Sequence, residues 1–193
     1  MRAAALSADD LVSTAAERES LAALRRVVGR ADGPMERHGV RVFVLVESMA
    51  AQAGLAVDRE AVLCASLLHD IGLYPGASEG GPYVSDGRHF ASGLLAPRSW
   101  PAERLERCLE AIERHHELRA QWHRGPEVEL VRRADLIELT AGLVRFRMRG
   151  GWLRGLFRAA PRAGFYPEIA RLLGRALRER PATLPRIFVV ARA

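Results

Sequence analysis

The sequence contains no lysine, only two cysteines and few aromatic residues (6%). All 29 basic residues are therefore arginines, which together with abundant Ala, Leu and Val indicates a bias in codon usage. The net charge of +6 is thus weak support for a nucleic-acid partner, and no RNA-recognition or zinc-finger pattern adds to it. Cys64 and Cys108 both lie inside predicted helices, form no disulfide framework, and indicate a reducing cytoplasm.

Long apolar runs are also absent. No uncharged run of about 18 apolar residues occurs, so we expect neither a transmembrane helix nor membrane contact. The apolar stretch at the N-terminus ends at Asp9 and Asp10, which is too short for a signal peptide. With 193 residues, 49% of them hydrophobic and 27% charged, the chain has the composition of one soluble, cytoplasmic domain. Its oligomeric state is left open.

Helical periodicity predominates, with no series of alternating strands, so the sequence predicts an all-α fold. We expect helices at about 7–28, 34–54, 58–70, 88–96, 101–119, 127–149 and 166–180. The valines of residues 40–46 alternate and could form a strand, but the segment continues as a helix to Gly54. Residues 73–87 are rich in Gly, Pro and Ser, and we expect a loop that acts as a lid or selects the substrate.

Two later segments carry less information. Residues 145–162 are basic with interleaved aromatic residues, which is typical of a solvated loop or helix resting on the core. Contact with a membrane surface or a nucleic acid is the alternative. Residues 184–193 are expected to form a short extended segment docked on the body.

The apolar segment 61–68 ends in His69 and Asp70. Burying an imidazole and a carboxylate without partners costs several kcal/mol, so these two side chains need a common partner. Asp135 raises the same question, because it shares a predicted helix face with Val128, Val131 and Leu139.

Both groups belong to an ordered series of histidines and aspartates, separated by gaps of 31, 20, 26 and 20 residues: His38, His69 with Asp70, His89, the pair His115 and His116, and Asp135. Each position in the series falls on a different predicted helix. Imidazole nitrogens and carboxylate oxygens are ligands for divalent Fe, Mn, Zn or Co. A helical bundle can bring such ligands together in its core, so the series predicts a buried metal site.

This order, with "LLHDIG" at its centre and "ADLIE" at its close, resembles the HD-domain superfamily of metal-dependent phosphohydrolases over residues of about 34–145. The resemblance implies an all-α bundle, here one domain over 1–193 with a C-terminal extension at 146–193, and one or two divalent metals in its core. It implies first-metal ligands at His38, His69, Asp70 and Asp135, with Asp70 bridging to a second metal. His89 and the 115/116 pair match the additional histidines of two-metal members.

Several roles stay open. The family pattern "AI..H" favours His115 as the ligand, whereas the apolar stripe of Leu105, Leu109 and Ile112 points to His116. Of the two we favour His115, because small bundles often place ligands at the edge of a core stripe. Arg41 lies one turn after His38 and is a candidate for a bidentate phosphate contact, with a structural role as the alternative. Two acidic residues are candidates for orienting the ligand histidines, namely Glu117 and Glu138.

Two divalent ions opposite two aspartates leave excess positive charge, which favours an anionic substrate. A water bound by such ions loses a proton near neutral pH and becomes a nucleophile. We therefore expect a dinuclear, metal-dependent hydrolase acting on a nucleotide or another small phosphoester, with Asp70 and Arg41 as catalytic residues.

Three alternatives remain. The stretches "HGVRVF", "DGRHFASGLLA" and "AIERHH" are also similar to cyanamide-hydratase-like HD proteins. Some HD relatives with this histidine set are di-iron oxygenases. The third alternative is a non-catalytic, nucleotide-binding HD module.

Overall fold

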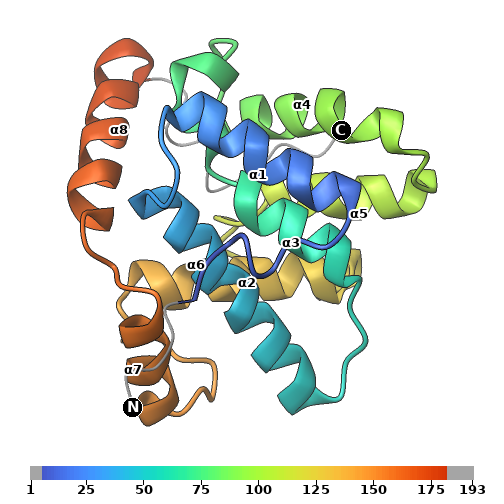
Figure 1. The fold of residues 1–193 in the computed structure, drawn as a ribbon, viewed down its shortest axis with the longest axis vertical. Coiled ribbons are helices and arrows are strands. Elements are labelled where there is room, and N and C mark those ends of the chain that lie inside the picture. Colours follow the sequence, from blue (N-terminus) through green and yellow to red (C-terminus); the bar gives the residue numbers. More distant parts are fainter. Residues whose placement is uncertain (1–5, 182–193) are drawn as a thin grey trace.

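The computed structural model describes residues 6–181, and within this range the chain is helical without any β-strand (Figure 1). The all-α prediction is confirmed. The α-helices are α1 (Ala15–Val28), α2 (Pro34–Ala53), α3 (Arg59–Leu68), α4 (Tyr83–Leu95), α5 (Ala102–Glu113), α6 (Pro126–Leu139), α7 (Gly150–Ala159) and α8 (Phe165–Glu179). Four short 3₁₀ turns join them: η1 (Ile71–Leu73), η2 (Pro75–Ala77), η3 (Ala96–Arg98) and η4 (Trp122–Arg124).

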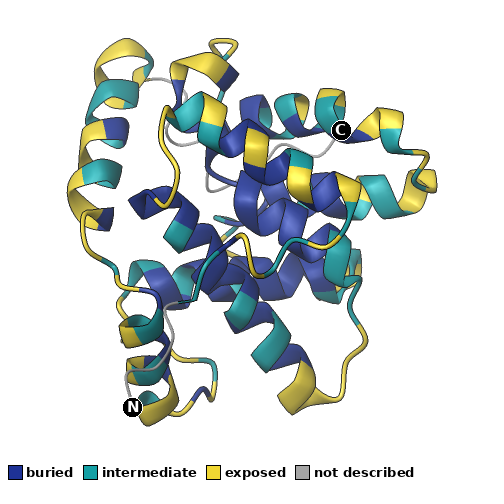
Figure 2. Ribbon diagram, in the orientation of Figure 1, coloured by how far each residue is buried: buried dark blue, intermediate teal, exposed yellow. Residues whose placement is uncertain are grey.

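Helix α2 is central to the core and packs against both α3 and α6 (Figure 2). It begins at Pro34, whose fixed φ suits a first helical turn, and ends before Gly54 in the left-handed conformation with φ 64°. The helix prediction for residues 40–46 is therefore confirmed over the strand alternative.

Helix α3 is buried along most of its length. The carboxylate of Asp58 caps its N-terminus by accepting a hydrogen bond of 3.1 Å from the backbone N–H of Ala61. Every residue from Ala61 to Leu68 is buried, and the helix stops there, with His69 as its C-cap. His69 and Asp70 thus emerge from the end of an apolar helix in the middle of the protein.

Close packing of α2 on α3 depends on Gly39. A β-carbon at this position would lie 2.7 Å from the carbonyl oxygen of Ser66. The missing side chain therefore allows the two backbones to touch, next to His38 on one helix and three residues before His69 on the other.

The segment after α3 differs from the prediction of a lid loop. Only residues 78–82 lie between η2 and α4, which begins at Tyr83, five residues earlier than expected. The carboxylate of Asp86 folds this connection back on α4 by accepting hydrogen bonds from the backbone N–H groups of Glu79 and Gly81. Because Asp86 and Gly87 are themselves buried, the segment is part of the body of the protein.

Gly72 brings η1 against the start of α4, and its replacement provides a test of this packing. A β-carbon at Gly72 would overlap the carbonyl oxygen of Tyr83 and lie 2.7 Å from the backbone nitrogen of Gly87. We expect Gly72→Ala to lower the free energy of unfolding by about 1–3 kcal/mol, measured by urea denaturation.

The control for this measurement is Gly93→Ala on the exposed side of α4, where a β-carbon meets nothing within 4 Å. It should raise the free energy of unfolding by about 0.5–1 kcal/mol, because alanine is the better helix former. Equal effects of the two substitutions would contradict the close approach.

Several helix boundaries also differ from expectation. Helix α1 begins at Ala15, after a capping box between Thr14 and Glu17, and not near Ser7. Helix α6 ends ten residues early, because the N–H of the left-handed Gly142 turns back to the carbonyl of Ile137 at 2.8 Å. The predicted extended segment 184–193 lies outside the described residues. Among residues 6–181 no helix is long and apolar enough to cross a membrane. A cytoplasmic location stays a prediction.

Candidate metal centre

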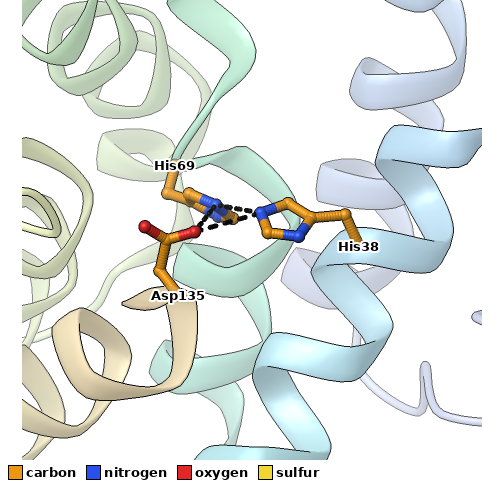
Figure 3. A group of neighbouring side chains, drawn as sticks. All are labelled: His38, His69 and Asp135. Atoms are coloured by element: carbon orange, nitrogen blue, oxygen red, sulfur yellow. Dashed lines mark hydrogen bonds and ion pairs between the residues drawn. The ribbon is translucent and has the colours of Figure 1, made fainter. Parts of the chain in front are cut away.

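Three side chains from separate elements meet in the core between α2, α3 and α6 (Figure 3). His38 Nε2 lies 2.9 Å from His69 Nε2 and 3.3 Å from Asp135 Oδ1. All three residues are buried. The sequence series therefore converges in space at this point.

Asp70 and His115 extend the cluster. Asp70 Oδ2 lies 3.5 Å from His38 Nε2 and 3.4 Å from His69 Nε2. The other carboxylate oxygen of Asp70, Oδ1, lies 3.5 Å from His115 Nε2. Asp70 thus faces two groups of donors with its two oxygens.

His116 approaches the cluster as well. The structure therefore brings both His115 and His116 to the aspartates. His116 Nδ1 lies 3.5 Å from Asp135 Oδ2, while His115 faces Asp70. The His115 side chain is fully buried, whereas that of His116 is 19% exposed. His116 therefore forms the more accessible side of the cluster.

Two of the histidines are oriented by the same local geometry. His69 Nδ1 lies 2.9 Å from the Ser66 carbonyl oxygen, and His115 Nδ1 lies 2.6 Å from that of Ile112. In each case the ring bonds to the carbonyl three residues earlier, a group left unpaired where α3 or α5 ends. Because a carbonyl only accepts, Nδ1 of each ring donates its proton, which leaves Nε2 as the ring atom that faces the cluster.

His38 is oriented by a carboxylate instead. Its Nδ1 lies 2.9 Å from Glu138 Oε2, which leaves Nε2 facing His69. Burial lowers the pKa of His38, but the charges of Glu138 and Asp135 raise it more, to about 9. Glu138 therefore has the position predicted for a residue that orients a ligand histidine.

The two aspartates are ionised. Burial raises the pKa of Asp135, yet hydrogen bonds from His38 and His69 hold it well below the ordinary value. For Asp70, burial is outweighed by the charges of His69 and His115, and its pKa is also lowered. The positive charge that compensates the two buried carboxylates here is that of the surrounding histidines. With neutral rings, a bound cation has to supply it.

The donor set fits a divalent metal ion. Asp135 Oδ2 is buried and has no hydrogen-bond partner, which leaves a carboxylate oxygen to be satisfied. Around an ion with bonds of about 2.1 Å, neighbouring donors lie about 3.0–3.4 Å apart. The Nε2 atoms of His38 and His69 and the nearer oxygens of Asp70 and Asp135 are separated by 2.9–3.8 Å. Imidazole and carboxylate together suit divalent transition metals.

The family model of the HD domain matches residues 35–140, which is more than half of the chain. The chain belongs to the HD domain family. Every clustered histidine and aspartate lies within the matched range. HD domains bind divalent metals and are in general metal-dependent hydrolases. No curated protein matches the chain.

In this HD domain, His89 does not join the cluster. Its side chain is 72% exposed, and its Nε2 lies 3.2 Å from Glu79 Oε1 at the surface. With α4 beginning at Tyr83, the buried face of the helix carries Tyr83, Gly87 and Ala91 at helical spacing, and His89 lies outside it. The structure therefore contradicts the prediction of His89 as a metal ligand.

Arg41 also has a different position from the one predicted. It is fully buried, its Nε donates to Glu138 Oε1 at 2.6 Å, and its Nη1 donates to the Pro161 carbonyl at 3.0 Å. Arg41 thus lies behind His38 and holds the carboxylate that orients it. A direct contact with substrate phosphate is not compatible with this position. Glu117, the other acidic candidate, pairs with Arg114 at 3.2 Å.

Sequence reasoning missed two aromatic residues at the centre. The Tyr83 hydroxyl lies 3.3 Å from His115 Nε2, and the Phe165 ring stacks on His38 with 4.6 Å between centroids. The spacing of Tyr83 with Gly87 and Ala91 was a usable signal for a helix face. Phe165 follows the motif by 30 residues, and no pattern in the sequence links it to the histidines.

A cavity of about 160 Å³ opens beside the centre. It is lined by His115, His116, Glu117, Leu118, Arg132, Asp135, Leu136 and Leu139. The cluster residues His115, His116 and Asp135 thus share the lining with a second carboxylate, one arginine and three leucines. A small molecule that enters this cavity reaches His116 and Asp135.

Proposed function

We propose that this HD domain is a divalent-metal-dependent hydrolase that cleaves the phosphoester of a nucleotide or another small molecule. The observation that carries the proposal is the convergence of three histidine Nε2 atoms and two ionised aspartates beside an open cavity. This arrangement combines a metal-binding donor set with access for a substrate.

The chain offers donors for one ion or two. His38, His69, Asp70 and Asp135 would hold the first ion. The remaining oxygens of the two aspartates, with His115 and His116, are donors for a second. When bound, a divalent ion polarises a phosphoryl oxygen and lowers the pKa of a bound water.

Residues of the cavity wall would bind and orient the substrate. Arg132 takes the role first assigned to Arg41, because it lines the cavity and its guanidinium is fixed by Glu129 at 2.8 Å and 2.9 Å. An arginine held in this way has donors left for a phosphate. Leu136 and Leu139 exclude water from one side of the bound substrate. Asp70 lies between the two donor groups, and its role in catalysis would be to hold the metal with oxygens that face both groups.

The test is hydrolysis by the full chain loaded with manganese, iron, cobalt or zinc. With p-nitrophenyl phosphate and nucleoside monophosphates, we expect phosphate release that stops when EDTA is added. Arg132→Gln should raise KM by about tenfold or more through the loss of a charge-assisted contact. Its control is Arg154→Gln, an exposed arginine on α7 that does not line the cavity.

Two outcomes would contradict the proposal. The first is a release of phosphate no greater than in the EDTA control with all four metals. The second is a mixed-valence di-iron centre detected by paramagnetic resonance together with oxygen uptake, which would support the oxygenase alternative instead.

A further inference from the structure

A second and larger cavity, of about 450 Å³, lies at the other end of α2. It is lined by Met49, Gln52, Ala53, Trp122, Leu130, Arg133, Phe146 and Arg147. None of these residues lines the cavity at the metal centre. Met49 follows His38 by 11 residues on the same helix, which corresponds to about 16 Å. The volume is within the range of small-molecule sites, about 300–1,000 Å³.

The cavity combines apolar side chains with two arginines, and of these only Arg133 has an acidic partner among residues 6–181. Arg133 is fixed between two rings, with its guanidinium carbon 4.9 Å from the centroid of Trp122 and 4.7 Å from that of Phe146. Its Nε donates to Glu129 at 2.6 Å, but its Nη groups make no hydrogen bond to residues 6–181. Arg147 makes neither a hydrogen bond nor an ion pair within the same range.

The charge is not balanced locally. The carboxylate of Glu129 is shared between Arg132 and Arg133, and no acidic side chain is among the residues that line the cavity. The cavity thus contains the guanidinium groups of Arg133 and Arg147, and the carboxylate that pairs with Arg133, that of Glu129, is shared with Arg132. The resulting positive charge attracts an anion.

Two adjacent residues that line this cavity, Phe146 and Arg147, have a strained backbone conformation. The N–H of Met148 donates to the Arg145 carbonyl at 2.8 Å, closing a turn whose two central residues have φ of 42° and 71°. Such turns favour Asn and Gly, and the left-handed conformation costs other residues about 1–2 kcal/mol each. Here it is occupied by a phenylalanine and an arginine that both line the cavity. Strain retained at two adjacent lining residues is typical of a binding site.

We propose that this cavity is a second ligand site, separate from the metal centre, which binds a small organic anion. The anionic group, a phosphate or a carboxylate, contacts Arg133 and Arg147. An aromatic or apolar body of the same molecule lies against Trp122, which is 43% exposed, and Leu130.

The test is calorimetric titration with 5′-AMP and with benzoate of the full chain, from which metal has been removed with EDTA and the EDTA then removed by dialysis, so that no divalent ion attracts the anion to the other site. We expect saturable binding of one molecule per chain for at least one probe, and the comparison shows whether phosphate or carboxylate is preferred. The neutral analogues adenosine and benzamide should bind about tenfold more weakly, because the charge-assisted contact is lost.

Two variants locate the site. Arg147→Gln should weaken binding about tenfold or more, whereas Arg154→Gln, which changes the net charge equally outside the cavity, should leave it within about twofold. Ala53→Trp, at the exposed end of α2, should fill the cavity and abolish binding. The proposal is overturned if neither probe binds saturably up to about 10 mM. It is also overturned if the two arginine variants weaken binding equally.

Discussion

Asp70→Asn is expected to abolish metal binding. The substitution keeps the shape of the side chain but removes the negative charge that faces three histidines at 3.4–3.5 Å. Loss of a residue that only orients a ligand lowers metal affinity about 10–100-fold, so loss of a carboxylate in the donor set should exceed that range. Elemental analysis of the purified variant should show less metal than one ion per ten chains, and metal-dependent phosphate release should disappear with it.

His89→Ala is the matched control, because it also removes one polar side chain from the predicted ligand series but lies at the surface. It should retain the metal content and the activity of the unmodified protein. A folded Asp70→Asn variant with normal metal content would contradict the proposed centre. A His89→Ala variant that loses its metal would contradict the placement of this residue outside it.

Glu138→Ala is expected to destabilise the protein by about 3–5 kcal/mol. The Glu138 carboxylate is fully buried and accepts from Arg41 at 2.6 Å, Arg162 at 3.0 Å and His38 at 2.9 Å. Burial raises the pKa of Glu138, but the charges of these three partners lower it by more than burial raises it. The carboxylate is therefore ionised. Its removal leaves the guanidinium of Arg41 buried without a counter-charge, which is the costly element of a broken buried ion pair.

Urea denaturation measures the loss in the free energy of unfolding. The control is Glu47→Ala, another glutamate-to-alanine substitution, on helix α2. Glu47 is a partly exposed residue of α2 without a hydrogen bond or ion pair to residues 6–181, so its replacement should change stability by no more than about 0.5 kcal/mol. The metal affinity of Glu138→Ala should also fall about 10–100-fold, because His38 loses the group that orients it. Unfolding of both variants at the same urea concentration would contradict this account.

The sequence was sufficient for the parts of the centre that depend on helix phase and spacing. His69 and Asp135 lie on apolar helix faces, and His38 was linked to them by the ordered series of histidines and aspartates, so their convergence could be predicted. His89 was assigned wrongly because the Gly and Pro content of residues 75–87 concealed the start of α4. An error of five residues in a helix start changes which side chains belong to the predicted segment, and only Tyr83 reveals the buried face.

The position of Arg41 shows a different limit. Periodicity places this residue one turn from His38 on a buried face, but it does not tell whether the guanidinium contacts a substrate or the back of the ligand histidine. That depends on Glu138 and Pro161, which are about 100 residues away in the sequence. Contacts of this range are set by tertiary packing, and a single sequence contains no pattern for them.

The family match ends at residue 140, yet the back wall of the centre comes from beyond that boundary. Phe165 stacks on His38, Arg162 bonds to Glu138, and the Pro161 carbonyl accepts from Arg41. The six clustered histidines and aspartates and their surroundings are therefore encoded in separate parts of the chain. Substitutions at residues 161–165 can change the electrostatics around His38 while the histidine and aspartate pattern stays intact, so HD proteins with identical ligand patterns need not share the reactivity of their metal.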